Sequence, residues 1–219
     1  MFNIAIDGPS ASGKSTIAKK IAQKLGFVHI DTGAMYRALA YKCIKKNVDL
    51  EDEESCVNLA KNTEIELLEN GAVFLDGYNV TKSIRNDEVS LAASKISQYK
   101  EVRHILVKLQ QAMASKKGFV MDGRDITSVV LTDAEVKIFQ TADVKVRAQR
   151  RFQELIDKGI EADYDEVYED LVKRDNQDLN REESPLIKVN DAIEIDTTYL
   201  SIDESVALIM NFIKERGLI

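Results

Sequence analysis

The sequence predicts an α/β fold in which helices flank a parallel sheet, and three observations support this prediction. Short apolar segments rich in β-branched residues alternate with longer segments of helical periodicity. A glycine-rich loop joins the first apolar segment to the first helical one, as in a strand–helix–strand unit with parallel strands. A block of short segments separated by turn dipeptides interrupts the alternation, which indicates an inserted subdomain with its own sheet.

The amino-terminal segments are expected to form the first strand, the first helix and the second strand. The apolar run from Phe2 to Asp7 stops at Gly8-Pro9, a pair that breaks regular structure. Apolar residues at helical spacing predict a helix from Lys14 to Leu25, which Gly26 ends. The second buried strand is expected at Phe27–Ile30.

The carboxyl-terminal half supplies three more buried strands and the last helix. The strands are expected at 119–121, 136–139 and 192–195. Ser201 and Glu204 have the spacing of a capping box, so the last helix is expected to open at Ser201. Its buried face would consist of Ile202, Val206, Ile209 and Ile213.

The segment between the second and third strands is too long for a plain crossover and contains hairpin signals. Asn70-Gly71 and Asp76-Gly77 predict a three-stranded antiparallel sheet over 65–68, 73–75 and 78–80. Two helices are expected to follow, at 87–97 and 101–116. The predicted division is a core (1–34, 117–145 and 182–219), an inserted α+β domain (35–116) and an arginine-rich helical region (146–181).

Composition and charge exclude several classes of protein. The chain has 219 residues, of which 44% are hydrophobic, but it lacks the run of about 20 apolar residues that a membrane span requires. A net charge of −7 argues against a nucleic-acid-binding protein, because affinity for nucleic acid comes largely from neutralising phosphates. Cys43 and Cys56 have no motif spacing, which favours reduced thiols in a cytoplasmic protein. A monomer is the default expectation.

Residues 8–15 match the pattern G-x-x-x-x-G-K-[ST] without a gap, between a strand and a helix. Such a loop directs backbone N–H groups at phosphate oxygens, and the following helix adds the positive end of its dipole. Lys14 would contact the β- and γ-phosphates, and the Ser15 hydroxyl would bind Mg²⁺. The expected site for ATP with Mg²⁺ comprises Gly8, Pro9, Ser10, Ala11, Ser12, Gly13, Lys14, Ser15 and Thr16.

Three further segments carry the fixed cations that an enzyme needs to hold two polyanions together. They are Asp31-Thr32-Gly33-Ala34-Met35-Tyr36-Arg37, Met121-Asp122-Gly123-Arg124-Asp125 and the segment from Lys173 to Arg181. In this order around a phosphate-binding loop, they resemble the bacterial cytidylate kinase family over essentially the whole chain. The resemblance implies a five-stranded parallel sheet of order 2-3-1-4-5, a monophosphate-binding insertion and a short helical lid. It also implies transfer of the γ-phosphoryl group of ATP to CMP or dCMP.

The acceptor site follows from the chemistry of these residues and from the resemblance. Arg37 and Arg124, at the ends of neighbouring strands, are expected to bind the acceptor phosphate. By resemblance, Ser94, Arg103 and Asp125 read the cytosine edge, and Arg174 and Asp178 hold the ribose and phosphate. The full expected site comprises Thr32, Arg37, Ser94, Arg103, Arg124, Asp125, Arg174, Asp178 and Arg181.

In the expected reaction, an acceptor phosphate oxygen attacks the γ-phosphorus in line. The expected catalytic residues are Lys14, Arg124, Arg147 and Arg151, with Asp122 positioning Mg²⁺ through water. Arg150 is an alternative to Arg147 and Arg151 as the arginine on the transferring group. Two other functions stay open: a kinase of the same fold for UMP, AMP or a non-nucleotide, and a nucleotide-dependent switch. The guanine-reading motif N-K-x-D, which switch GTPases need, is absent.

Overall fold

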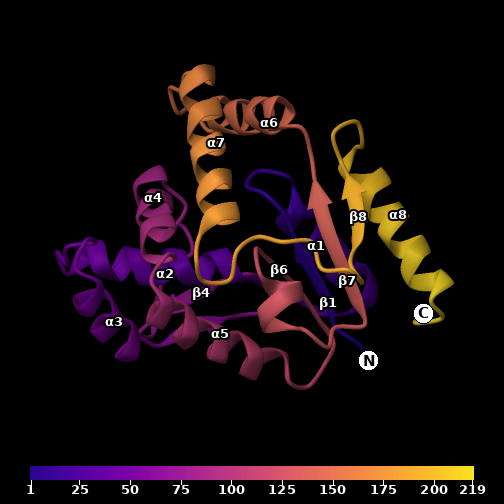
Figure 1. The fold of residues 1–219 in the computed structure, drawn as a ribbon, viewed down its shortest axis with the longest axis horizontal. Coiled ribbons are helices and arrows are strands. Elements are labelled where there is room, and N and C mark those ends of the chain that lie inside the picture. The colour runs from indigo at the N-terminus through magenta and orange to yellow at the C-terminus, as the bar shows by residue number, and fades with distance from the viewer.

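A computed structural model describes all 219 residues and contains two separate sheets (Figure 1). The larger sheet consists of five parallel strands. Their spatial order is β2 (Val28–Asp31), β6 (Phe119–Gly123), β1 (Ile4–Asp7), β7 (Val136–Thr141) and β8 (Ile193–Asp196). Counted along the chain without the insertion, this is the predicted order 2-3-1-4-5, so the predicted fold class is confirmed.

Helices cover both faces of this sheet. Successive residues of a strand point to opposite sides, so one strand contributes to two apolar clusters. Ile4 and Ile6 belong to one apolar cluster with α1 (Lys14–Leu25) and α8 (Ile202–Glu215). Ala5 belongs to a second cluster with α5 (Lys100–Ala114) and the π-helical turn η1 (Ile126–Val130). Burial on both faces explains why these strands appear in the sequence as uninterrupted apolar runs.

Helices α1 and α8 begin where the sequence predicts, whereas α5 ends two residues before the predicted Lys116. Helix α1 has the predicted bounds, and Gly26 ends it in the left-handed region at φ 67°. Ser201 and Glu204 form the predicted capping box of α8. Val206, Ile209 and Ile213 are buried as expected, whereas Ile202 is only half buried. Ile202 is in the first turn of α8, where it packs at the edge of the core and also approaches the phosphate-binding loop at Gly13.

The insertion has its own apolar core and its own sheet. It contains α2 (Thr32–Lys45), α3 (Glu53–Lys61), β3 (Ile65–Leu67), β4 (Val73–Leu75), β5 (Tyr78–Asn79), α4 (Asp87–Ile96) and α5. The sheet is antiparallel with order β3-β4-β5, as predicted. Helix α2 continues through the boundary expected after residue 34, so a rigid element carries the chain from the sheet into the insertion.

Two helices stand over the carboxyl end of β7 and complete the molecule (Figure 1). They are α6 (Val144–Asp157) and α7 (Tyr164–Asn180), which pack against each other. Asp143 and Asp163 cap their amino termini by accepting backbone N–H bonds. No helix of the protein combines the length and the apolar character that a membrane crossing requires.

Candidate active site

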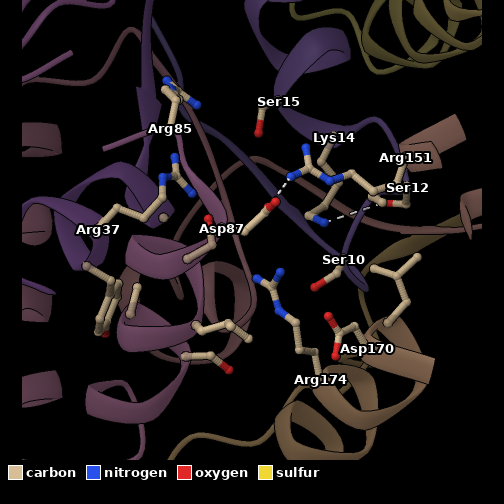
Figure 2. Close-up of a pocket in the computed structure, with 18 of the residues that line it drawn as sticks. Ser10, Ser12, Lys14, Ser15, Arg37, Arg85, Asp87, Arg151, Asp170 and Arg174 are labelled. Carbon is tan, nitrogen blue, oxygen red and sulfur yellow. Dashed lines mark hydrogen bonds and ion pairs between the residues drawn. The ribbon is translucent and has the colours of Figure 1, made fainter. Parts of the chain in front are cut away.

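A large cleft lies at the carboxyl edge of the parallel sheet, where the core, the insertion and the α6–α7 pair meet (Figure 2). Its volume is about 550 Å³. The loop after β1, the start of α2, helix α4, the loop after β6 and helices α6 and α7 all contribute to its walls. Open parallel sheets bind ligands at this edge, because the loops that follow neighbouring strands converge there.

The phosphate-binding loop forms one wall. Ser10 to Thr16 line the cleft, whereas Gly8 and Pro9 do not. A Cβ atom on Gly8 would lie 1.9 Å from the Gln140 carbonyl oxygen, so only glycine fits there. The Lys14 Nζ donates to the Pro9 carbonyl at 2.6 Å and to the Ser12 hydroxyl at 3.3 Å. Burial and the nearby Arg124 lower the pKa of Lys14 to about 7, so an incoming polyanion would stabilise its charged form.

Ser15 and Asp122 bring two hard oxygen ligands together beside this loop. The Ser15 hydroxyl donates to Asp122 Oδ2 at 2.6 Å. The other carboxylate oxygen of Asp122 lies 2.7 Å from His29 Nε2, which fixes the orientation of the carboxylate. A hydroxyl and a carboxylate, with phosphate and water oxygens, form a ligand set that suits Mg²⁺.

Arg37 and the unexpected Arg85 share one acid on the insertion side. Arg37 Nη2 lies 2.8 Å from Asp31 Oδ2, and Arg85 Nη1 lies 3.3 Å from the same oxygen. Asp31 also caps α2 by accepting from the Ala34 N–H. Although burial alone would raise the pKa of Asp31, the two arginines bring it below its usual value. Asp31 thus holds a pair of arginines at the cleft, next to Thr32.

Arg124 connects the loop after β6 to α7 and to the phosphate-binding loop. Its Nε lies 2.8 Å from Asp178 Oδ2, and its Nη2 donates to the Ser10 hydroxyl at 2.8 Å. Asp178 also pairs with Arg181, at 3.5 Å. Arg174 does not pair with Asp178, although the two residues are four apart on one helix.

Arg174 lines the cleft and makes no ion pair with an acidic side chain. Burial lowers its pKa, and nearby Arg124, Arg37 and Arg151 lower it further. Like charges gathered in a partly buried cleft repel one another unless an anion lies among them. The middle of the cleft is therefore suited to highly charged phosphate groups.

The three expected base-reading residues line the same cleft. Arg103 is buried and pairs with Asp125 at 2.5 Å. The Ser94 hydroxyl donates to the Gln177 side chain at 3.2 Å, and Gln177 donates back to the Ser94 carbonyl at 2.7 Å. Gln177, a residue that the sequence did not single out, therefore links α4 to α7 beside this pocket.

Buried polar atoms without partners surround this pocket. They are the Tyr36 hydroxyl, Arg37 Nε, Arg103 Nε and Arg181 Nη2. Buried polar groups in folded proteins are nearly always hydrogen-bonded, so such a group of unpaired atoms indicates a place for a polar ligand.

The three arginines of α6 have different surroundings. Arg147 is buried, lies 2.6 Å from Asp175 and donates to the Ser10 carbonyl at 3.0 Å, and it does not line the cleft. Arg150 donates to the Thr197 carbonyl at 2.7 Å, away from the cleft. Arg151 alone of the three lines the cleft. Arg147 thus contacts the phosphate-binding loop from outside the cleft. Of the three arginines, only Arg151 faces the space for a transferring group.

Comparisons with known proteins agree with this architecture. The family model for cytidylate kinase matches residues 4–215. The chain is 48% identical over 219 residues to the cytidylate kinase of Bacillus subtilis (strain 168), covering 99% of this chain and 98% of that protein. It is 51% identical over 206 residues to the cytidylate kinase of Caldicellulosiruptor bescii, covering 93% and 91%. An uncharacterized protein from Eubacterium ventriosum ATCC 27560 shares the fold, with a TM-score of 0.53, 15% identity and 98% coverage of both chains.

Proposed function

The chain belongs to the cytidylate kinase family, and we propose that it transfers the γ-phosphoryl group of ATP to CMP and dCMP. The products are CDP or dCDP and ADP. One observation carries the proposal: a single cleft joins a phosphate-binding loop to the Ser94, Arg103 and Asp125 pocket, with arginines between them. A protein that only bound or hydrolysed ATP would have no use for the second pocket.

The donor site is proposed to be the phosphate-binding loop. The backbone N–H groups of the loop and the amino terminus of α1 would bind the β- and γ-phosphates, with Lys14 between them. Ser15 and Asp122 would hold Mg²⁺, directly and through water respectively. When bound, the ion would neutralise the charge on the donor phosphates. His29 would keep the Asp122 carboxylate oriented for this role.

The acceptor site is proposed to have a phosphate end and a base end. The acceptor phosphate would bind to the arginines that line the cleft between the phosphate-binding loop and the base pocket. These are Arg37, Arg85, Arg124 and Arg174. Asp178 and Arg181 would bind the ribose and the neighbouring phosphate. At the base end, the cytosine 4-amino group would donate to Asp125, and Arg103 or Ser94 would donate to the ring acceptors. Uracil has a carbonyl in place of the amino group, so it would leave Asp125 without a donor.

The proposed reaction needs positioning and charge more than proton transfer. An acceptor phosphate oxygen forms the new bond to the γ-phosphorus while the bond to the bridging oxygen of ADP breaks. Phosphate monoesters have a second pKa of about 6, so the nucleophile is already ionised at neutral pH without a general base. Lys14, Arg124 and Arg151 would stabilise the charge on the transferring group. Arg147 would act indirectly, by holding Ser10 and Asp175 in place.

The proposal is tested by ADP formation from Mg²⁺ and ATP with CMP, dCMP, UMP, AMP, GMP or no acceptor. Strong turnover with CMP and dCMP and little ADP without an acceptor is the expected result. Equal ADP release with and without acceptors would contradict it. Because both pockets are complete within one chain, we also propose that the monomer is active, and turnover per chain should not depend on protein concentration.

A further inference from the structure

Arg124 and Asp125 lie on a two-residue arch that leaves the sheet. Gly123, the last residue of β6, precedes the arch, and Ile126, the first residue of η1, follows it. The arch brings one phosphate-facing side chain and one base-facing side chain into the cleft. Because strand pairing ends at Gly123, the backbone position of these two residues depends on what holds the two ends of the arch.

Both ends of the arch are held by Asp7, the last residue of β1. The backbone of Asp7 is paired in register with Gly123, at the first end. Its side chain holds the second end: Oδ1 accepts from the Ile126 N–H at 2.8 Å, and Oδ2 accepts from the Thr127 N–H at 2.7 Å. The Thr127 hydroxyl donates to the same Oδ2 at 2.6 Å. One residue, fully buried, thus sets the separation between the two ends.

The surroundings of the arch leave it little freedom to adjust. A Cβ atom on Gly123 would lie 2.6 Å from the Thr32 hydroxyl and 2.7 Å from Ile126 Cδ1. Asp7 is also followed directly by Gly8, the first residue of the phosphate-binding loop. A shift of Asp7 would therefore move the acceptor-reading arch relative to the donor loop.

We propose that Asp7 is a positioning residue for acceptor recognition, which places Arg124 and Asp125 by holding both ends of their arch. The proposal rests on the proposed function, since it assigns these two side chains to the acceptor. Asp7 itself does not line the cleft, so its effect on the acceptor is indirect.

Asp7 is a carboxylate at a position where burial disfavours its charged form. Burial raises the pKa of Asp7 to about 6, and the negative charge of Asp125 adds to this effect. The bonds from Thr127 and Ile126 oppose it, and Lys14 is the nearby cation whose charge Asp7 supports. A neutral side chain would be easier to bury, but it would not offer two acceptor oxygens to three donors.

The test compares Asp7→Asn with Asn3→Ala, a matched control at the residue just before the opposite end of the same strand. The Asn3 side chain also ties β1 to its surroundings, by accepting from the Phe119 N–H at 3.1 Å and donating to the Ala114 carbonyl at 3.2 Å. It is buried and remote from the cleft. Both variants lose hydrogen bonds of a buried polar side chain. Only Asp7→Asn weakens the bonds that hold the arch, because it turns an amide N–H₂ toward backbone donors.

The readouts are kcat and KM for CMP, UMP and ATP, with thermal unfolding as a measure of folding. Losing hydrogen bonds to a buried charge corresponds to roughly a 10- to 100-fold effect. Asp7→Asn should therefore lower kcat/KM for CMP by about that factor and reduce the preference for CMP over UMP. Its KM for ATP should stay within about twofold, and Asn3→Ala should keep the wild-type preference.

Equal losses toward CMP, UMP and ATP in Asp7→Asn, or an unchanged preference, would overturn the positioning role. Thr127→Val, which removes only one of the three bonds, should shift the preference in the same direction and less, and it serves if Asp7→Asn does not fold. Failure of the proposed function would look different, because the wild-type protein itself would then show no turnover of CMP.

Discussion

The guanidinium group of Arg151 lies 2.6 Å from the carboxylate of Asp87, and this ion pair joins α6 to the first turn of α4 (Figure 2). Both residues line the cleft. The acid on the insertion thereby neutralises the one arginine of α6 that faces the space for a transferring phosphoryl group. A phosphate entering this space would compete with Asp87 for Arg151.

We predict that Asp87→Asn lowers the KM for ATP slightly and leaves kcat nearly unchanged. The pair is partly exposed, so it is worth about 0.2–1 kcal/mol, which limits the change to roughly fivefold. Arg151→Ala should instead lower kcat by on the order of 10³-fold, since the cation itself is lost. Initial rates at low and high salt measure both effects. A loss of kcat in Asp87→Asn as large as that in Arg151→Ala would show that the pair belongs to the active arrangement.

Lys14→Ala should abolish most of the activity without weakening the fold. Lys14 is buried, and its hydrogen bonds are to the Pro9 carbonyl and the Ser12 hydroxyl. Because both hydrogen-bond partners are neutral groups, its removal breaks no direct ion pair. We expect kcat to fall by on the order of 10²–10³-fold while the free energy of unfolding changes by less than about 1 kcal/mol. Denaturant titration beside steady-state kinetics checks this, and a large loss of stability would contradict it.

Arg124→Ala should reduce both activity and stability, because Arg124 has a structural partner. Its removal would leave the buried Asp178 with Arg181 alone, at 3.5 Å. An uncompensated buried charge of this kind costs about 3–5 kcal/mol. The double variant Arg124→Ala/Asp178→Asn should recover much of that stability but none of the activity. Recovery of turnover in the double variant would show that Arg124 does not act on the substrates.

Much of the fold could be predicted because its signals are local. The strands of the parallel sheet are uninterrupted apolar runs, Gly26 ends α1, and Asn70-Gly71 and Asp76-Gly77 mark the hairpins. Helix α3 is less evident, since it is short and its periodicity is weak over so few residues. The phosphate-binding loop is equally local, as a contiguous pattern between a strand and a helix.

The roles of several residues around the cleft were harder to predict, because long-range contacts determine them. The roles of Arg147 and Arg151 diverge only through Asp175 and Asp87, which lie far away in the sequence. Arg85 is on an irregular loop before α4 and has no pattern to mark it. Gln177 could have been found, since it lies three residues after Arg174 and four before Arg181, on one helical face.

The free energy of unfolding should depend on pH through the titration of Asp7. Its pKa is about 6 in the folded protein against an ordinary 3.8, so between pH 4 and 6 the folded state holds the proton more firmly than the unfolded state. The free energy of unfolding should therefore decrease as pH rises through this window, by up to about 3 kcal/mol. Asp7→Asn lacks this titration, so the difference in stability between wild type and variant should change across the window and level off above pH 6. Urea unfolding of both proteins from pH 4 to 7.5 measures it, and a difference that stays constant with pH would mean that the Asp7 carboxyl titrates alike in the folded and unfolded chains.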